Sequence, residues 1–246
     1  MRYFIEFAYK GTRYKGWQSQ PDTPLTVQET LENNLSMVLR TPISLTGAGR
    51  TDAGVHARQQ FAHFDFGREI DCEKLTYNMN ACLPYDISVA AFHAVHDDAH
   101  ARFDAKRRTY EYHIHKHKDP FLKELSYQYL HKLDVDAMNR ATDILFDYND
   151  FECFSKVKTD VHTFICRIFE ARWEETTHKL VFTISADRFL RNMVRAIVGT
   201  LIDVGLGKLK PGDLREIIGS KDRRQAGFSV PAYGLYLTQI EYEYIK

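Results

Sequence analysis

Cysteines are few in this 246-residue chain, and no two of the four have the C-x-x-C spacing of zinc sites and redox motifs. The first six residues include Arg2 and Glu6, whereas a secretory signal has an unbroken apolar stretch after its basic start. The sequence therefore predicts a protein with reduced thiols, and we expect it to be cytoplasmic.

Long apolar runs are absent as well. A membrane-spanning helix needs about 20 consecutive apolar residues, but the run from Ala196 to Ile202 is closed by Asp203. We therefore expect no association with a membrane. With 44% hydrophobic residues, the chain has enough apolar content for a folded core, either as one large domain or as two halves.

An excess of charge of one sign is also lacking, because 33 lysines and arginines balance 33 aspartates and glutamates. The charges are unevenly distributed: residues 102–118 carry six basic and two acidic side chains, whereas residues 134–152 carry six acidic side chains and Arg140. Because charge fields are screened within about 10 Å, such patches can attract an RNA backbone to one face of a neutral protein. An ordinary solvated surface is the alternative interpretation.

Alternating strand and helix patterns organise the first hundred residues. Thr26 and Glu29 have the spacing of a helix-capping box, and Asp71 is placed to cap a second helix. The expected elements, in order, are a strand at Tyr3–Tyr9, a helix after Thr26, strands at Ile43–Thr46 and Gln59–Phe66, a helix after Asp71, and a strand at Ile87–Val95.

The second half repeats this order. Its expected elements are a strand at Thr109–His115, a helix at Val135–Leu145, strands at Ile168–Trp173 and Lys179–Ser185, a helix at Phe189–Val204, a short helix at Pro211–Ile218 and a strand at Leu235–Tyr244. The pattern predicts an α+β protein made of two ferredoxin-like or RRM-like βαββαβ halves with antiparallel sheets. We expect the halves to span residues 1–104 and 105–246.

The densest group of chemically active side chains lies in the glycine-rich stretch Gly47–Ala57, which contains Arg50, Asp52 and His56. Glycines let a backbone approach a ligand closely, and the aspartate is suited to act as a nucleophile or general base. The same composition also fits a tight turn whose carboxylate caps backbone N–H groups. The stretch lacks the Lys-Ser/Thr pair of a phosphate-binding P-loop.

Three histidines alternate at positions 113, 115 and 117, so a strand would place them on one face. Three imidazoles can bind zinc, but no cysteine or carboxylate at metal-ligand spacing accompanies them. We therefore expect no metal site and no cofactor.

The nine residues Gly49–Ala57 read G-R-T-D-A-G-V-H-A and resemble, without a substitution, the active-site signature of the tRNA pseudouridine synthase A family. Further similarities run along nearly the whole chain, among them Gly16–Gln20, Asn78–Pro84, Arg108–Tyr112, Phe189–Arg195, Lys221–Arg223 and Gly234–Leu237. The resemblance implies the pseudouridine synthase fold and a cofactor-independent isomerase. It also implies a homodimer that converts uridine to pseudouridine at about positions 38 to 40 of the tRNA anticodon stem-loop.

The resemblance also implies roles for particular residues. Asp52 is expected to be the catalytic carboxylate, Arg195 its cationic partner, and Tyr110 the aromatic residue that stacks on the uracil. Arg50 is expected to hold the displaced base and Leu235 to pack against it. The candidates for phosphate and sugar contacts are Arg13, Lys15, Gln18, Arg107, Arg108, Lys221 and Arg223.

One departure from the family pattern affects RNA binding. Ala186-Asp187-Arg188 stands where Gly-Asn-Gly or Gly-Asn-Ala is common, so Arg188 is a further candidate for a phosphate contact. Two other functions remain open from the residues alone. The first is a non-catalytic RNA-binding module, against which the absence of an RRM-type RNP1 motif counts. The second is an aspartate-dependent hydrolase or transferase acting on a small phosphate ester.

Overall fold

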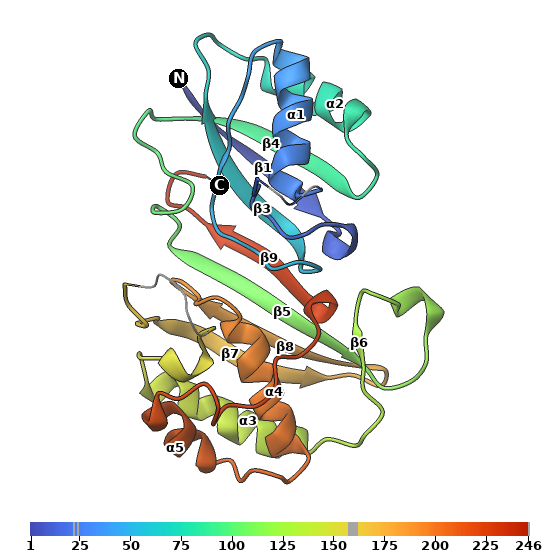
Figure 1. Cartoon of the computed structure of the whole chain (residues 1–246), viewed down its shortest axis with the longest axis vertical. Helices are drawn as coiled ribbons and strands as arrows, with labels where there is room; N and C mark the ends of the chain where they lie inside the picture. Colours follow the sequence, from blue (N-terminus) through green and yellow to red (C-terminus); the bar gives the residue numbers. More distant parts are fainter. Residues whose placement is uncertain (22, 24, 157–161, 246) are drawn as a thin grey trace. The chain divides into compact units, whose positions relative to one another are not determined.

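The computed structural model describes residues 1–21, 23, 25–156 and 162–245 (Figure 1). The chain divides into two compact units: an N-terminal unit of Met1–Arg107 with Tyr236–Lys246, and a C-terminal unit of Arg108–Leu235. Both combine helices with mostly antiparallel strands, which confirms the expected α+β class. The units differ from the expected halves because residues 236–246 group with the N-terminal unit.

The N-terminal unit has the expected βαββαβ order. Its elements are β1 (Arg2–Tyr9), α1 (Val27–Leu39), β2 (Thr46–Gly47), β3 (His56–Asp65), α2 (Cys72–Cys82) and β4 (Ile87–Val95), with a 3₁₀ turn at Gly11–Arg13. Strand β1 is central and runs antiparallel to both β3 and β4. Helices α1 and α2 lie beside each other on one side of these strands (Figure 1).

Both helices of this unit begin where their capping residues predict. The Thr26 hydroxyl accepts a hydrogen bond from the Glu29 N–H at 3.3 Å, and the Asp71 carboxylate accepts one from the Lys74 N–H at 3.0 Å. Each bond satisfies a backbone N–H that has no partner within the helix. The helix starts are therefore fixed by local side-chain chemistry.

The strand expected at Ile43–Thr46 is shorter and lies later in the chain, because the residues that pair with β3 are Thr46 and Gly47. Ile43 and Leu45 are buried in alternation, as in a strand, but their N–H groups donate to side chains. The Ile43 N–H bonds the Ser36 hydroxyl and the Leu45 N–H bonds the Glu32 carboxylate, both at 2.8 Å. Side chains of α1 thus replace the neighbouring strand as hydrogen-bond acceptors.

Strand β3 begins at His56, three residues before its expected start, because its first residues gain a second partner. Strand β9 (Leu235–Glu241) pairs in parallel with His56 and Ala57 through Tyr236 and Leu237. The His56 and Tyr236 rings also stack, with centroids 4.7 Å apart. The C-terminal strand therefore stabilises the end of β3 that follows the glycine-rich stretch.

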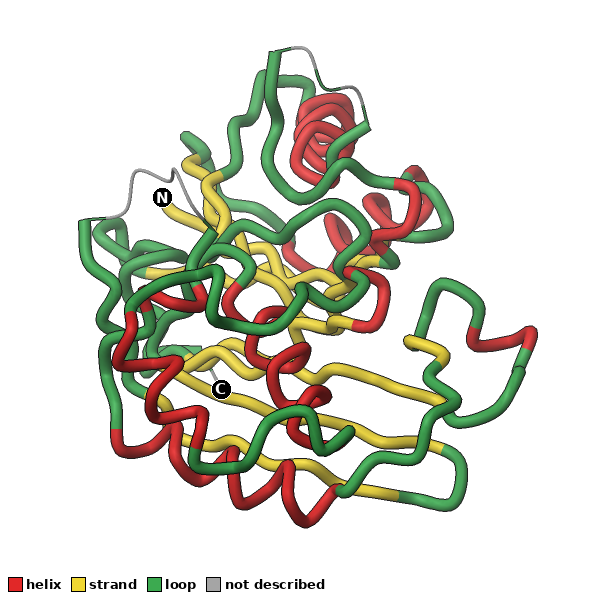
Figure 2. Tube along the Cα trace, turned by 60° about the horizontal axis from the view of Figure 1, so that its bottom comes forward, coloured by secondary structure: helices red, strands yellow, loops and turns green. Residues whose placement is uncertain are grey.

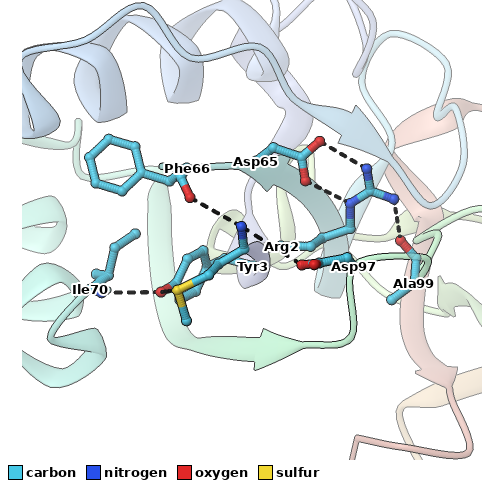
Figure 3. Close-up of polar contacts among 8 residues, drawn as sticks. Arg2, Tyr3, Asp65, Phe66, Ile70, Asp97 and Ala99 are labelled. Carbon is cyan, nitrogen blue, oxygen red and sulfur yellow. Dashed lines mark hydrogen bonds and ion pairs between the residues drawn. The ribbon is translucent and has the colours of Figure 1, made fainter. Parts of the chain in front are cut away.

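The start of β1 is tied to the end of β3 by polar contacts (Figure 3). The Arg2 guanidinium donates two hydrogen bonds of 2.8 Å to the Asp65 carboxylate and one of 2.9 Å to the Ala99 carbonyl. The Tyr3 hydroxyl accepts a bond from the Ile70 N–H at 3.1 Å. These contacts fix the register of β1, the strand that supports β3.

The C-terminal unit is built on three long antiparallel strands, with β8 paired to β5 on one side and to β7 on the other (Figure 2). Helix α3 packs against both α4 and β7. The elements are β5 (Arg107–His115), β6 (Tyr127–Gln128), α3 (Val135–Asp143), β7 (Ile168–Glu175), β8 (Lys179–Ala186), α4 (Met193–Gly205) and α5 (Asp213–Ser220), with 3₁₀ turns at Pro120–Leu122, Ile144–Asp147, Glu152–Phe154 and Ala232–Gly234. Strand β6, which pairs in parallel with β5, was not predicted.

Helix α4 begins at Met193 rather than at the expected Phe189. Asn192 has a φ of +67°, a left-handed conformation that a helix interior does not accept. Its side-chain amide donates to the Ser229 hydroxyl at 2.6 Å, so the turn before α4 is fixed by a distant residue.

No helix in the described parts of the chain combines the length and apolar character needed to cross a bilayer.

Candidate active site

Asp52 lies on the loop between β2 and β3, in the N-terminal unit. The loop closes with a tight turn in which the Val55 N–H donates to the Asp52 carbonyl at 3.1 Å and Gly54 has a φ of +81°. Asp52 itself is half-buried, between the buried Thr51 and the exposed Ala53. A half-buried carboxylate on a fixed turn is open to a ligand but restricted in position.

A second segment, residues 11–17, packs directly on this loop. A methyl group at Gly11 would lie 1.9 Å from the Val55 carbonyl oxygen, and one at Gly16 would lie 2.6 Å from the Thr51 carbonyl oxygen. The Trp17 N–H also donates to that Thr51 oxygen at 3.2 Å. Only glycine permits this approach, so residues 11–17 hold the backbone on both sides of Asp52.

His56 follows the loop and is buried. Its Nδ1 accepts a hydrogen bond from the Gly11 N–H at 3.0 Å, which leaves the proton of the neutral ring on Nε2. The Thr51 hydroxyl is hydrogen-bonded to the Tyr9 hydroxyl at 2.7 Å. The threonine and histidine of the signature motif therefore hold the loop rather than face solvent.

Several expected RNA-contact residues lie on this segment or just after it. Arg13 and Lys15 are exposed and Gln18 is half-exposed, while Arg50 is exposed on the Asp52 loop itself. Four of these candidates therefore lie on the Asp52 loop, or on or next to the chain segment that packs against it. The segment that carries Arg13 and Lys15 is held in place by its contacts with the loop, and Gln18 directly follows it.

Asp86 anchors the segment from the other side. Its buried carboxylate accepts a hydrogen bond from the Tyr14 hydroxyl at 2.6 Å and lies 3.4 Å from the Arg13 guanidinium. Burial, followed by the bond to Asp86, raises the pKa of the Tyr14 hydroxyl, which therefore stays protonated and keeps donating. The position of Arg13 follows from this anchor.

Tyr110 lies on β5 in the C-terminal unit, opposite Ile184 of β8. Its half-buried ring meets the Phe189 ring edge to face, with centroids 5.2 Å apart and planes at 87°. Edge-to-face packing fixes the orientation of an aromatic ring while leaving other parts of it accessible. Tyr110 is therefore a ring held at a set angle.

Arg195 lies in the first turn of α4, and its guanidinium is oriented by the segment that returns across this helix. Its Nε donates to the Val230 carbonyl at 2.7 Å, and the Val230 N–H donates back to the Arg195 carbonyl at 3.3 Å. The reciprocal pair fixes both the side chain and the backbone of Arg195.

Residues 226–230, here called the α4 strap, lie unusually close to the helix. A methyl group at Gly199 would lie 1.8 Å from the Phe228 carbonyl oxygen, and the Gly227 N–H donates to the Thr200 hydroxyl at 2.8 Å. The strap is thus pressed onto the face of α4 one turn beyond Arg195. The sequence alone did not reveal this strap, although the two glycines that permit the contact, Gly199 and Gly227, are a signal for close backbone packing.

Arg223 holds the strap in shape. Its guanidinium donates to the Ala226 and Gly227 carbonyls at 3.3 and 3.0 Å and to the Ser229 hydroxyl at 2.9 Å. Lys221, the neighbouring candidate for RNA binding, donates to the Asp150 carboxylate at 2.6 Å. Both expected phosphate contacts therefore already bind groups of the protein.

The strap continues into the turn before Leu235. The Tyr112 hydroxyl donates to the Pro231 carbonyl at 2.9 Å, and a methyl group at Gly234 would lie 2.6 Å from the Tyr112 ring. Burial raises the pKa of the Tyr112 hydroxyl, while the charge of Arg195 opposes this rise. Leu235 follows this turn and is buried.

The other two phosphate-contact candidates, Arg107 and Arg108, begin β5, and Arg108 donates to the Asp187 carbonyl at 2.7 Å. In the histidine-rich part of β5, His113 Nε2 lies 2.7 Å from the Glu111 carboxylate and His115 is buried. Among the described residues, no group of three or more histidine, cysteine or acidic side chains is placed to hold a metal ion.

Comparison with known proteins covers both units. A sequence model of the family described as tRNA pseudouridine synthase matches residues 6–104 and 148–243, which include Asp52, Arg195 and Leu235 but not Tyr110. The chain is 52% identical over 245 residues to tRNA pseudouridine synthase A of Porphyromonas gingivalis, an alignment that covers 98% of this chain and 97% of that protein.

A more distant relative is aligned over an equally large share of its length. The chain is 38% identical over 247 residues to tRNA pseudouridine synthase A of Bacillus subtilis, which covers 99% of this chain and 100% of that protein. The signature loop, the fold class and these alignments agree. The chain belongs to the tRNA pseudouridine synthase A family, isomerases that convert uridine to pseudouridine in tRNA.

Proposed function

We propose that this enzyme modifies uridines at about positions 38 to 40 of the tRNA anticodon stem-loop, with Asp52 as the essential carboxylate. The observation that best supports this role is the clamped loop: Gly11 and Gly16 press on the backbone on either side of Asp52. A catalytic group must be held in place to act at one carbon of a ribose, because misplacement by about 1 Å can reduce a rate by about 100-fold.

The reaction is an isomerisation that leaves the composition of the nucleotide unchanged. The N1–C1′ glycosidic bond breaks, the uracil turns, C5 bonds to C1′, and the C5 proton is released while N1 gains a proton. An ionised Asp52 serves this sequence by attacking C1′ or C6, or by removing a sugar proton. All three routes require the charged carboxylate.

The other catalytic roles rest on side chains that the protein orients. Arg195 stabilises the ionised form of Asp52, since a cation offsets the loss of hydration in a closed site. The Tyr110 ring stacks on the uracil, and its hydroxyl serves the transfer of the C5 proton. Leu235 packs against the base.

The target uridine must leave the helical stack to be modified, at a cost of a few kcal/mol. Arg50, exposed on the Asp52 loop, holds the displaced base. Arg13, Lys15 and Gln18 contact phosphate and sugar groups nearby, which positions the RNA without reading its sequence. Arg107, Arg108, Lys221 and Arg223 complete the proposed contact set, with smaller contributions from Arg108, Lys221 and Arg223 because these three already bind protein groups.

The decisive test uses tRNA labelled with tritium at C5 of uridine. Only pseudouridine formation expels this hydrogen, so its release distinguishes the enzyme from an RNA-binding module and from a phosphate-ester hydrolase. We expect release by the wild-type chain, none above background by Asp52→Asn, and tRNA binding by that variant within a few-fold of wild type. Appreciable release by Asp52→Asn would remove Asp52 from the mechanism.

The position of the modified uridine and the oligomeric state of the enzyme are tested separately. Sequencing of pseudouridines in tRNA from cells that lack the protein should show losses confined to about positions 38 to 40. We further propose a homodimer that acts in the cytoplasm, where its four unpaired cysteines remain reduced. Light scattering of the purified chain should give twice the mass of 28.7 kDa.

A further inference from the structure

One end of the C-terminal sheet gathers arginines from three different elements. Ala186, the last residue of β8, pairs with Arg108 of β5 on one side and with Ile168 of β7 on the other. Arg167 directly precedes Ile168, and Arg188 follows Ala186 by two residues. The three arginines therefore lie close together at the same end of the paired strands.

Asp187 is the residue around which they are organised. Its carbonyl oxygen accepts a hydrogen bond from the Arg108 guanidinium at 2.7 Å. One of its carboxylate oxygens accepts from the backbone N–H groups of Arg167 and Arg188, at 2.8 and 2.7 Å. The Asp187 N–H donates to the Arg167 carbonyl at 3.1 Å, which closes the link between the two strands.

This arrangement leaves two guanidinium groups available to a ligand. Among the described residues, no carboxylate forms an ion pair with Arg167 or Arg188, because Asp187 binds their backbones and not their side chains. Within the described ranges, the Arg188 side chain donates one hydrogen bond, to the Thr163 carbonyl at 3.3 Å. By contrast, Arg172 and Arg215 in the same unit pair with acidic side chains.

An exposed aromatic ring lies beside these charges. The Arg167 guanidinium lies 5.6 Å from the centre of the Phe169 ring, which is 39% exposed. A guanidinium held over an aromatic face keeps its N–H groups directed outward, and such pairs suit phosphate and base contacts in nucleic acids.

We propose that Arg167 and Arg188, organised by Asp187 and flanked by Phe169, form a binding site for the tRNA phosphate backbone. The site is separate from the contact residues around the Asp52 loop. The proposal rests on tRNA being the substrate of the proposed function.

The test compares two double variants that remove the same charge. Arg167→Gln with Arg188→Gln removes the proposed site, and Arg172→Gln with Arg215→Gln removes two arginines that are paired with acidic groups. The Kd for unmodified tRNA transcript is measured against salt concentration. Each lost phosphate contact should reduce the slope of log K against log salt by about 0.7 to 0.9.

For the site variant we expect a Kd raised about tenfold or more at low salt and a slope reduced by roughly 1.5. Its KM for tRNA should rise, its kcat at saturating tRNA should stay unchanged, and its Tm should match that of wild type. Arg167→Lys with Arg188→Lys should restore most of the slope. The control variant should bind like wild type.

Two results would overturn the proposal. An unchanged Kd and salt slope in the site variant would show that the RNA does not contact this end of the sheet. An equal loss of affinity in both variants would show a general effect of net charge. The binding measurement does not depend on Asp52, so absence of tritium release by the wild-type chain would contradict the proposed function and leave this test intact.

Discussion

The contact between Gly199 and the α4 strap can be tested by adding a single methyl group. In Gly199→Ala the new carbon would lie 1.8 Å from the Phe228 carbonyl oxygen, whereas ordinary contact begins at 3.4 Å. The obstacle is backbone, which cannot rotate away as a side chain could. The strap must therefore move outward by about 1.6 Å, the difference between these two distances.

This displacement affects stability in two ways. Forcing a methyl group into a packed interior costs about 1 to 3 kcal/mol. A shift of this size also breaks the bond from the Gly227 N–H to the Thr200 hydroxyl, and it stretches the bond from Arg195 to the Val230 carbonyl. Buried groups left without partners cost about 1 to 3 kcal/mol more. Together these costs lower the expected free energy of unfolding by about 2 to 6 kcal/mol.

Gly219→Ala is the matched control. Gly219 lies in α5 of the same unit, and a methyl group there would meet no atom within 4 Å. Alanine is more favourable than glycine inside a helix by about 1 kcal/mol, so this variant should be slightly more stable than wild type. The same chemical change thus has opposite expected signs at the two sites.

Urea denaturation followed by circular dichroism measures both variants. The reasoning would be refuted by a Gly199→Ala protein whose free energy of unfolding lies within about 0.5 kcal/mol of wild type, the range of ordinary surface substitutions. A second readout is catalytic. If the strap orients Arg195, then Gly199→Ala should lower the single-turnover rate even at temperatures at which the protein stays folded.

Three further predictions concern charge. If Arg195 stabilises ionised Asp52, Arg195→Ala should lose most single-turnover activity at neutral pH and regain part of it as rising pH ionises the carboxylate. Near-normal rates with an unshifted pH profile would argue against the pairing of Asp52 and Arg195. Burial lowers the pKa of His63 to about 4, so the unfolded state takes up a proton before the folded state does, and wild type loses stability as pH falls from about 6.5 to 4. Urea titrations should show that His63→Gln retains about 2 to 3 kcal/mol of the stability that wild type loses over this range. Identical pH dependence of the two proteins would contradict this prediction. Treatment with EDTA should leave tritium release unchanged, whereas loss restored by zinc would implicate the histidines at positions 113, 115 and 117.

The elements that sequence analysis placed correctly are those fixed by neighbouring residues. Thr26 and Asp71 cap the next turn of chain, so the starts of α1 and α2 follow from local chemistry. The errors occur where distant groups intervene. Ile43–Thr46 alternates like a strand but bonds the side chains of α1, and Asn192 adopts its left-handed conformation while bound to Ser229.

The candidate site shows the same division. The glycine-rich loop and its aspartate stand out in the sequence, because glycine spacing and a carboxylate are properties of adjacent residues. The strap does not stand out, since Val230 lies 35 residues beyond the arginine that it binds. The role of Arg223 was likewise hidden: its basic side chain suggested a phosphate contact, but its hydrogen bonds lie within the strap.

The Asp52 loop and the helix of Arg195 are held by the same kind of contact, each within its own unit. Gly11 and Gly16 bring one backbone against the Asp52 loop, and Gly199 and Gly227 bring another against the helix of Arg195. Contacts between backbones tolerate changes in most side chains but not an added methyl group at the glycines. Such contacts between backbones involve no side-chain rotamers, so in the folded protein they hold a neighbouring group more tightly than contacts between long side chains do. If Asp52 is the catalytic carboxylate, as proposed, the reaction gains from such rigidity, because holding the carboxylate and the displaced base in a productive orientation lowers the barrier.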